Sequence, residues 1–169
     1  PLCAPEELPA VREAELHCAC AALGLPTPLL PDYQDGQLAA ADPEALIAEI
    51  LLIIRELHPQ MILTFGADGL SGHPDHITIG QAAAEAFRRA EEVAALYTLA
   101  VPRSLAETLG MKQIHAVPDE SIALAVDVSS VWEAKMSAIR CHRTQLGESS
   151  ILDAPEAKQR LFLGAEHFC

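Results

Sequence analysis

A strand-length apolar run, Gln60-Met61-Ile62-Leu63-Thr64-Phe65, stands near the middle of the chain directly after Pro59. Pro59 ends the helical spacing of apolar residues that precedes it, and a glycine-rich loop follows the run. A compact apolar run between two such breakers is typical of a buried strand in a parallel sheet. The run therefore predicts one parallel strand of an α/β fold.

Helices and strands alternate outward from this run. Helical spacing covers Val11 to Leu23 and Pro43 to His58, and Asp42 supplies a capping carboxylate before the proline of the second helix. The elements expected after the central run are a helix over about 76–96, strands over 96–101, 113–117 and 121–128, and a helix over 131–146. This alternation predicts an α/β sandwich, and residues 1–169 are expected to form a single domain because no repeat or linker divides them.

The charge balance disfavours two classes of partner. Lys and Arg total 11 against 24 Asp and Glu, a formal charge of -13, which repels nucleic-acid phosphates and anionic lipid surfaces. No stretch approaches the roughly 20 apolar residues of a membrane span, and the start lacks the features of a signal peptide. We therefore expect a cytoplasmic protein with neither nucleic acid nor membrane as partner.

The five cysteines form an odd set without CxxC spacing, which argues against a disulfide framework and against a structural zinc knuckle. All five are therefore expected to be free thiols. They are Cys3, Cys18, Cys20, Cys141 and Cys169.

The loop that follows the central strand, residues 66–76, is the most polar of the chain. Ligands of open α/β sheets lie beyond the carboxyl ends of the strands, where this loop is expected. Three glycines let its backbone turn sharply and approach a ligand closely. Its last four residues, His73-Pro74-Asp75-His76, bring together two imidazoles and a carboxylate. The position of the loop beyond the strand and its concentration of ionisable side chains together predict an active site.

Two interpretations of these four residues remain open from spacing alone. In the functional one, His76 is a zinc ligand at the start of the next helix, and Asp75 hydrogen-bonds one of the rings and fixes its tautomer. In the structural one, His73 caps the loop, Asp75 caps the helix and His76 is solvated. The loop supplies only one or two of the roughly three protein ligands that a catalytic zinc needs.

Four patches resemble, in order, the LmbE-like or PIG-L de-N-acetylase family. Residues 64–77 resemble its TFGPDGxxGHPDH signature. Upstream, residues 12–16 resemble its RxxE helix and residues 32–36 its DG turn. Downstream, residues 135–145 resemble its KxxAxxxHxSQ helix. Each patch alone has an ordinary structural explanation, and their joint order is what points to the family.

The resemblance implies a Rossmann-like, three-layer α/β sandwich with a mainly parallel sheet. It implies a Zn²⁺-dependent hydrolase that removes the acetyl group from an N-acetylglucosamine-type sugar conjugate. His76 would bind the metal together with a histidine and an aspartate of an N-terminal HPDDE motif. His73 would stabilise or protonate the tetrahedral intermediate, and Asp75 would tune His73.

The other three candidate residues, Arg12, Asp35 and His142, are assigned to substrate binding within the resemblance. Arg12 and Asp35 have no partner in the zinc constellation and suit sugar hydroxyls or an anionic aglycone. Taken singly, they fit a solvated helix residue and a turn carboxylate equally well, and His142 fits a helix-face histidine.

One departure from the family pattern is large. No HPDDE occurs in these 169 residues, and the chain opens at Pro1 without an initiating Met. We therefore expect a fragment that lacks the N-terminal strand, two zinc ligands and the general base. Ser71 also replaces a tyrosine that some relatives place near the reacting carbonyl.

The alternative function is a non-catalytic α/β binding or assembly module with an incomplete metal site. The identity of the aglycone and the formation of a homo-oligomer are left open by the sequence.

Overall fold

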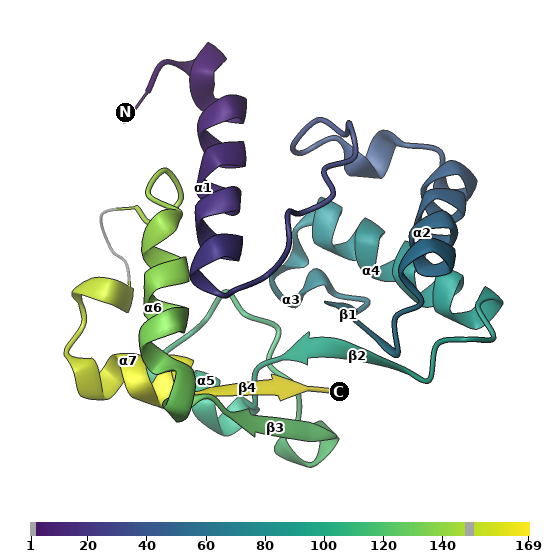
Figure 1. The fold of residues 1–169 in the computed structure, drawn as a ribbon. Coiled ribbons are helices and arrows are strands. Elements are labelled where there is room, and N and C mark those ends of the chain that lie inside the picture. Colours follow the sequence, from purple (N-terminus) through teal and green to yellow (C-terminus); the bar gives the residue numbers. More distant parts are fainter. Residues whose placement is uncertain (1–2, 148–150) are drawn as a thin grey trace. The chain divides into compact units, whose positions relative to one another are not determined.

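The computed structural model describes residues 3–147 and 151–169 as an α/β fold (Figure 1). Its helices are α1 Leu8–Ala22, α2 Pro43–Leu57, α3 Gly69–Gly72, α4 Pro74–Arg89, α5 Arg103–Leu109, α6 Trp132–Cys141 and α7 Glu156–Leu163. Its strands are β1 Met61–Phe65, β2 Ala95–Ala100, β3 Leu124–Asp127 and β4 Ala165–Phe168. The predicted fold class is confirmed.

The four strands form one mixed sheet in the order β1-β2-β4-β3. β1 and β2 are parallel, with Met61 opposite Ala95, as their connection through a helix requires. β4 runs antiparallel to β2, with Leu99 opposite Phe168. The parallel pair carries the loop of interest at the carboxyl end of β1.

Helices α2 and α4 form the main core together with β1. Small residues on α4, Ala82 and Ala86, let the helices approach closely, and Leu46, Ile47 and Ile54 of α2 fill the space between them. At Gly80 a methyl group would lie 2.5 Å from the carbonyl oxygen of Phe65, so only glycine fits where α4 crosses the end of β1. This close packing fixes the start of α4 relative to the loop after β1.

β1 is less buried than its composition suggests. Ile62 packs against the α2 and α4 core and Thr64 is buried, but Met61 and Leu63 are 54% and 57% exposed. Successive side chains of a strand point to opposite faces, and in the described residues the core covers the Ile62 face. The expectation of a buried run is therefore correct for one face and wrong for the other.

Helices α1, α6 and α7 form a second group of packed elements. α1 lies along α6, where Ala19, Met136 and Ala138 are buried. The guanidinium of Arg160 on α7 lies 4.5 Å from the ring centroid of Trp132 on α6. Lys135 Nζ donates to the carbonyl oxygen of Leu163 at 2.6 Å. Trp132 and Met136 are the large buried side chains of this group.

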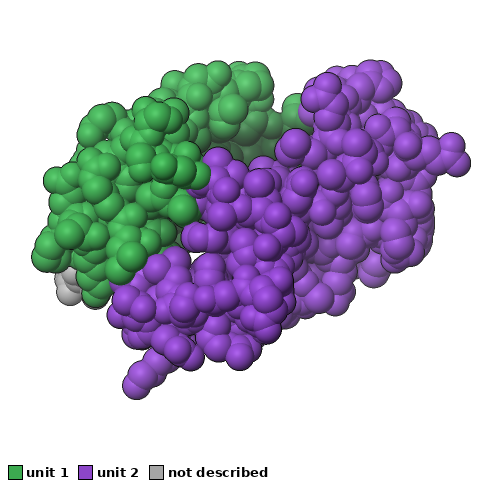
Figure 2. Space-filling model, turned by 90° about the horizontal axis from the view of Figure 1, so that it is seen from below, with its two compact units in different colours: residues 1–31, 127–165 green, residues 32–126, 166–169 purple. Residues whose placement is uncertain are grey.

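The chain groups into two compact units (Figure 2). Unit 1 comprises residues 1–31 and 127–165, which contain α1, α6 and α7. Unit 2 comprises residues 32–126 and 166–169, which contain most of the sheet with α2 to α5. The assignment of residues 1–169 to a single domain remains a prediction.

The expectation of five free thiols is wrong. Cys18 of α1 and Cys141 of α6 form a disulfide, with 5.8 Å between their Cα atoms. The two residues are 123 positions apart in sequence, and the packing of α1 along α6 brings them together. Cys3, Cys20 and Cys169 are free.

The boundaries of several elements also differ from the predictions, among them those of two helices. The helix expected over 76–96 begins at Pro74 and ends at Arg89. The prediction extended too far because Ala90 and Val93, which are buried in the connection to β2, continue the apolar spacing beyond the last helical residue. The helix expected over 131–146 ends at Cys141.

The strand expected over 113–117 does not form. The backbone N–H of His115 donates to the carbonyl oxygen of Leu70, and Val117 makes only an isolated bridge with Pro102.

None of the helices in residues 3–147 and 151–169 combines the length and the apolar character that crossing a bilayer demands.

Candidate functional site

The loop after β1 is held in a tight conformation by its own backbone. Asp68 Oδ1 accepts from the N–H of Leu70 at 3.0 Å, and the N–H of Gly72 donates to the carbonyl oxygen of Asp68 at 3.0 Å. Leu70 has φ +66°, an uncommon value for a residue with a side chain. At Gly69, which has φ +64°, a methyl group would lie 2.9 Å from Ile77 and 3.0 Å from Cβ of His76. The loop is therefore folded directly against the first turn of α4.

His76 lies in that first turn with its ring fixed on two sides. The ring stacks on Phe65, with 3.9 Å between centroids and 6° between planes. Its Nδ1 is 3.2 Å from the carbonyl oxygen of Gly69. A carbonyl oxygen only accepts, so Nδ1 carries the proton in the neutral ring and Nε2 keeps a free lone pair. That is the arrangement of a histidine that binds a metal through Nε2.

His73 caps α4 and has the opposite tautomer. The backbone N–H of Asp75 donates to Nδ1 of His73 at 3.2 Å, so the neutral ring carries its proton on Nε2. The rings of His73 and His76 lie 4.8 Å apart between centroids and are tilted by 36°. His73 is exposed, whereas His76 is half-buried. The pair therefore offers one lone pair and one N–H donor side by side.

Asp75 joins this loop to the turn that carries Asp35. Its Oδ2 accepts from the N–H of Gly36 at 2.7 Å, and its Oδ1 accepts from the N–H of Leu38 at 3.1 Å. Asp75 touches His73 through its backbone N–H, and its carboxylate holds the turn of residues 34–38. Asp35 is exposed in that turn, one residue from the carboxylate contact.

His115 was not among the residues that the sequence singled out. Its N–H donates to the carbonyl oxygen of Leu70 at 2.8 Å, and its Nδ1 lies 3.8 Å from Asp68 Oδ2. A methyl group at Gly72 would lie 3.4 Å from Cε1 of His115. The segment around His115 thus packs against the loop. A lone histidine in an apolar run gave no sequence signal of this.

Arg12 and His142 belong to unit 1. Arg12 lies on α1, and His142 is the residue that ends α6, with its Nδ1 3.2 Å from Nε2 of Gln145. The structure describes each unit by itself, so the assignment of these two residues to the substrate site stays a prediction.

Glu15 is a buried carboxylate of unit 1 whose importance the sequence did not reveal, although it is the acidic residue of the RxxE pattern. Its two oxygens accept from the N–H of Thr144 at 2.7 Å and from the hydroxyl of Thr144 at 2.6 Å. Burial opposes ionisation of Glu15, but these hydrogen bonds and the nearby His142 outweigh it and lower its pKa. The ionised carboxylate therefore joins α1 to the segment after α6.

A metal ion fits the donor chemistry at His76 but needs more ligands than the described chain offers. Residues 3–147 and 151–169 contain no group of three His, Cys, Asp or Glu side chains placed to hold a metal. The free lone pair on Nε2 of His76 supplies one ligand of a zinc site, for which about three protein ligands are usual.

Comparison with known protein families finds one whose profile covers this loop. The profile of the PIG-L family, described as GlcNAc-PI de-N-acetylase, matches residues 2–87, which is half of the chain and includes the loop with both histidines. The chain belongs to the PIG-L family. The matched residues include the loop after β1 with His73 and His76.

The relatives of this PIG-L chain are deacetylases by name. The 1D-myo-inositol 2-acetamido-2-deoxy-alpha-D-glucopyranoside deacetylase 1 of Saccharopolyspora erythraea is 34% identical, over 69% of this chain and 44% of its own length. The enzyme of the same name, without the number, from Rhodococcus jostii is 31% identical, over 85% of this chain and 63% of its own. The chain thus spans about half to two thirds of the length of these relatives.

Solved structures show the same fold. The N,N'-diacetylchitobiose deacetylase of Pyrococcus horikoshii matches with a TM-score of 0.65 and 19% identity, over 97% of this chain and 64% of that one. The conserved protein TT1542 of Thermus thermophilus matches with a TM-score of 0.61 and 20% identity, over 95% and 72%. At these identities the likeness concerns the fold alone.

Proposed function

We propose that this PIG-L chain is part of a zinc-dependent hydrolase that removes the acetyl group from an N-acetylglucosamine-type sugar conjugate. The observation that carries the proposal is the pair of contacts from Asp75 N–H to His73 Nδ1 and from His76 Nδ1 to the carbonyl oxygen of Gly69, from which we infer opposite tautomers, in a loop that the family match covers. The names of the relatives support the substrate class, because they describe deacetylation of an acetamido sugar linked to inositol.

The zinc ligand within this chain is His76, through Nε2. The family pattern assigns the remaining ligands, a histidine and an aspartate, to an HPDDE segment that these 169 residues do not contain. Zinc would supply Lewis-acid polarisation of the acetamide carbonyl and lower the pKa of water at the site. Stacking on Phe65 and the hydrogen bond to Gly69 hold the His76 ring in place for this task.

His73 acts on the oxygen and nitrogen of the acetamide. Its Nε2–H is free of the contact to Asp75 and donates to the oxygen that becomes negative as the carbonyl is attacked. A histidine in this position also suits proton transfer to the leaving amine, which must gain a proton as the C–N bond breaks. Asp75 keeps the ring oriented through its backbone N–H.

Three further side chains are proposed to bind the sugar. Asp35 would bind sugar hydroxyls, and the hydrogen bonds from Gly36 and Leu38 to Asp75, which hold the turn that carries Asp35, support this assignment. The family pattern also assigns Arg12 and His142 to substrate binding. The acidic composition disfavours anionic lipid and nucleic acid as partners, so the proposed enzyme is cytoplasmic and acts on a small sugar conjugate.

The test uses an enzyme in which residues 1–169 are joined to the HPDDE segment that the family pattern requires. It measures acetate release from N-acetylglucosaminyl-inositol and from N,N'-diacetylchitobiose. We expect release that stops when a chelator removes the metal and returns when zinc is added. Protein in which His17, an exposed histidine of α1, is changed to alanine serves as a control for loss of any histidine. Absence of acetate release from both substrates in the presence of zinc would favour the non-catalytic binding module.

A further inference from the structure

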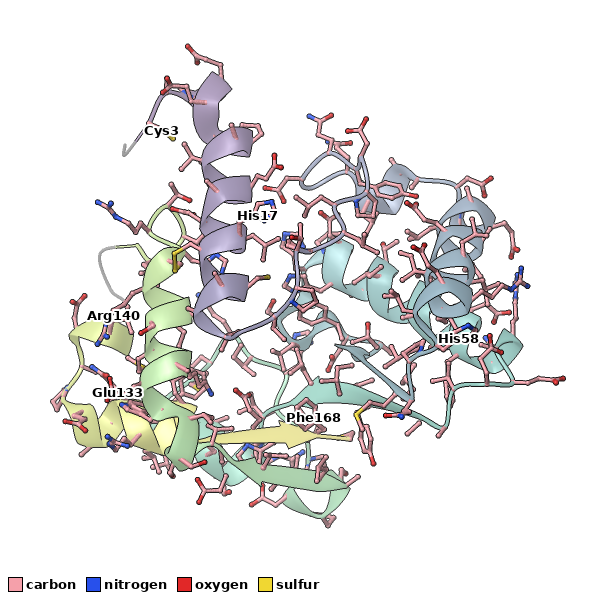
Figure 3. All side chains as sticks on the ribbon, viewed as in Figure 1. Cys3, His17, His58, Glu133, Arg140 and Phe168 are labelled. Carbon is pink, nitrogen blue, oxygen red and sulfur yellow. A yellow bond between two sulfur atoms is a disulfide. The ribbon has the colours of Figure 1, made fainter. Side chains whose placement is uncertain are left out.

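The disulfide between Cys18 and Cys141 joins α1 to α6 within unit 1, and Figure 3 draws a yellow sulfur–sulfur bond between these two helices. Cys18 is exposed on α1, and Cys141 is half-buried at the last position of α6. Neither sulfur has a role in the proposed hydrolysis. Cys18 is the more exposed of the two residues, so a thiolate from solution is expected to reach the bond from its side.

A cavity of about 860 Å³ opens beside the bond, and all of its walls belong to unit 1. Ala10, Val11 and Ala14 of α1 form an apolar side that leads to the two cysteines. A volume of this size admits a small organic molecule. The cavity therefore gives a low-molecular-weight thiol room to approach the sulfur atoms.

The charges around the cavity select among thiols. Glu6, Glu7 and Glu15 line it, against a single cationic side chain, Arg143. The lowered pKa of Glu15, which the hydrogen bonds from Thr144 produce against the effect of burial, keeps that carboxylate ionised at neutral pH. The local field is therefore negative, and it favours cationic or uncharged thiols over anionic ones.

We propose that Cys18–Cys141 is a thiol–disulfide exchange site that reacts with small cationic or uncharged thiols and fastens α1 to α6.

The chemistry is a two-electron reduction of the protein disulfide by two thiols. A thiolate attacks Cys18 Sγ, the bond between the two Sγ atoms breaks, and its electron pair leaves on Cys141 Sγ, which takes a proton from water. A second thiolate attacks the sulfur of the first reagent in the mixed disulfide and releases Cys18 as a thiolate, which is also protonated. The products are two protein thiols and one small-molecule disulfide. The reverse reaction with that disulfide restores the bond.

Opening the bond loosens the attachment of α1 to the end of α6. The remaining ties nearby are the hydrogen bonds from Thr144 to Glu15 and the packing of small side chains such as Ala19 and Ala138. His142, the residue after Cys141, sits on the segment that is released. Opening and closing of the disulfide therefore change the mobility of the segment that carries His142, which the family pattern assigns to substrate binding.

The first experiment establishes the bond and its effect on the fold. The protein is purified, its free thiols are blocked by alkylation, and it is digested without reduction and mapped by mass spectrometry. We expect a peptide joining Cys18 to Cys141, and hydrogen exchange in α1 and α6 at least about tenfold faster after reduction of the bond. Absence of the linked peptide, even after treatment with a small-molecule disulfide, overturns the proposal, as does unchanged hydrogen exchange.

The second experiment tests the thiol class. Reduction rates are compared for cysteamine and 2-mercaptoethanesulfonate, each corrected for its thiolate fraction. We expect cysteamine to react at least about fivefold faster at low salt, with the ratio falling at high salt. Equal rates at low salt contradict the assigned class.

Cys20→Ser is the matched variant, because Cys20 is a half-buried free cysteine of the same helix. It should keep the linked peptide, both rates and the exchange pattern of the unchanged protein. If Cys20→Ser loses the linked peptide, the bond depends on Cys20 and the assignment is wrong. None of these readouts involves deacetylation. The experiments therefore test the exchange site independently of the proposed function.

Discussion

His73 and His76 are three residues apart, yet their ring protons lie on opposite nitrogens. Hydrogen bonds from Asp75 N–H to one ring and from the other ring to Gly69 determine this. We expect ¹⁵N NMR of the metal-free protein at about pH 8, where ordinary histidines are neutral, to show Nε2–H for His73 and Nδ1–H for His76. The same tautomer at both residues would contradict the division of their roles.

Asp75 is expected to matter for the turn of residues 34–38 as well as for His73. In Asp75→Ala the N–H groups of Gly36 and Leu38 lose their acceptor, and the partly buried donor of Leu38 is costly to leave without a partner, whereas the exposed N–H of Gly36 can bond to water. The free energy of unfolding should fall by about 1–2 kcal/mol in urea titrations, with faster hydrogen exchange at those two amides. Glu91→Ala, which removes an exposed carboxylate, is the control and should change neither.

The sequence predicted the loop residues that form a contiguous pattern, and it missed contacts between residues that are distant in sequence. His73, Asp75 and His76 could be singled out because two imidazoles and a carboxylate in four residues form a recognisable pattern. The pairing of Cys18 with Cys141 and the buried contact of Glu15 depend on α1 packing along α6. No local pattern encodes such a contact between distant segments.

At the scale of helices and strands, the crossing of α4 over β1 depends on Gly80. Gly80→Ala would place a methyl group 2.5 Å from the carbonyl oxygen of Phe65, and backbone cannot yield as a flexible side chain can. We expect the free energy of unfolding to fall by about 1–3 kcal/mol, as for other overpacked sites. Gln81→Ala, at an exposed neighbouring position of α4, should be nearly neutral in the same denaturation measurement.

The attachment of α1 to the segment after α6 should depend on pH through Glu15. Its pKa is lower in the folded protein, because the hydrogen bonds from Thr144 outweigh burial. The stabilisation is therefore complete above the unfolded-state pKa of about 4.3 and is lost as the pH falls through the lower folded-state value. Thermal unfolding between pH 6 and pH 3 should show this loss, and Glu15→Gln should be less stable at pH 6 with a flatter profile. An unchanged profile in Glu15→Gln would contradict the assignment.

The elements with strong local signals were predicted, and those made by distant contacts were not. The start of α2 was predicted from Asp42 and Pro43, and Asp42 Oδ1 does accept from the N–H of Glu44 at 3.1 Å. The end of α4 was missed because buried apolar residues continue beyond it. β4 was missed because its pairing with β2 joins the last residues of the chain to a strand some 70 positions earlier.

At the scale of the whole molecule, the fold class could be predicted because alternating helix and strand patterns cover most of the chain. The family could be predicted because four short patterns occur in one order, and the match over residues 2–87 confirms it. The complete metal site could not be predicted from these residues. Only one ligand of the proposed zinc site, His76, lies in the described chain, and the relatives are longer than the part that this chain matches.

The central claim is that His76 holds zinc while His73 acts on the acetamide. The most direct measurement is zinc content beside acetate release for His76→Ala and His73→Ala in the zinc-loaded enzyme. His76→Ala should lose zinc and deacetylation together, because it removes a metal ligand. His73→Ala should keep its zinc and lower kcat by roughly 10²–10⁴-fold, because it removes a donor to the reacting oxygen and nitrogen. Loss of zinc in His73→Ala with retention in His76→Ala would reverse the two roles, and full activity in both variants would show that this loop is not the active site.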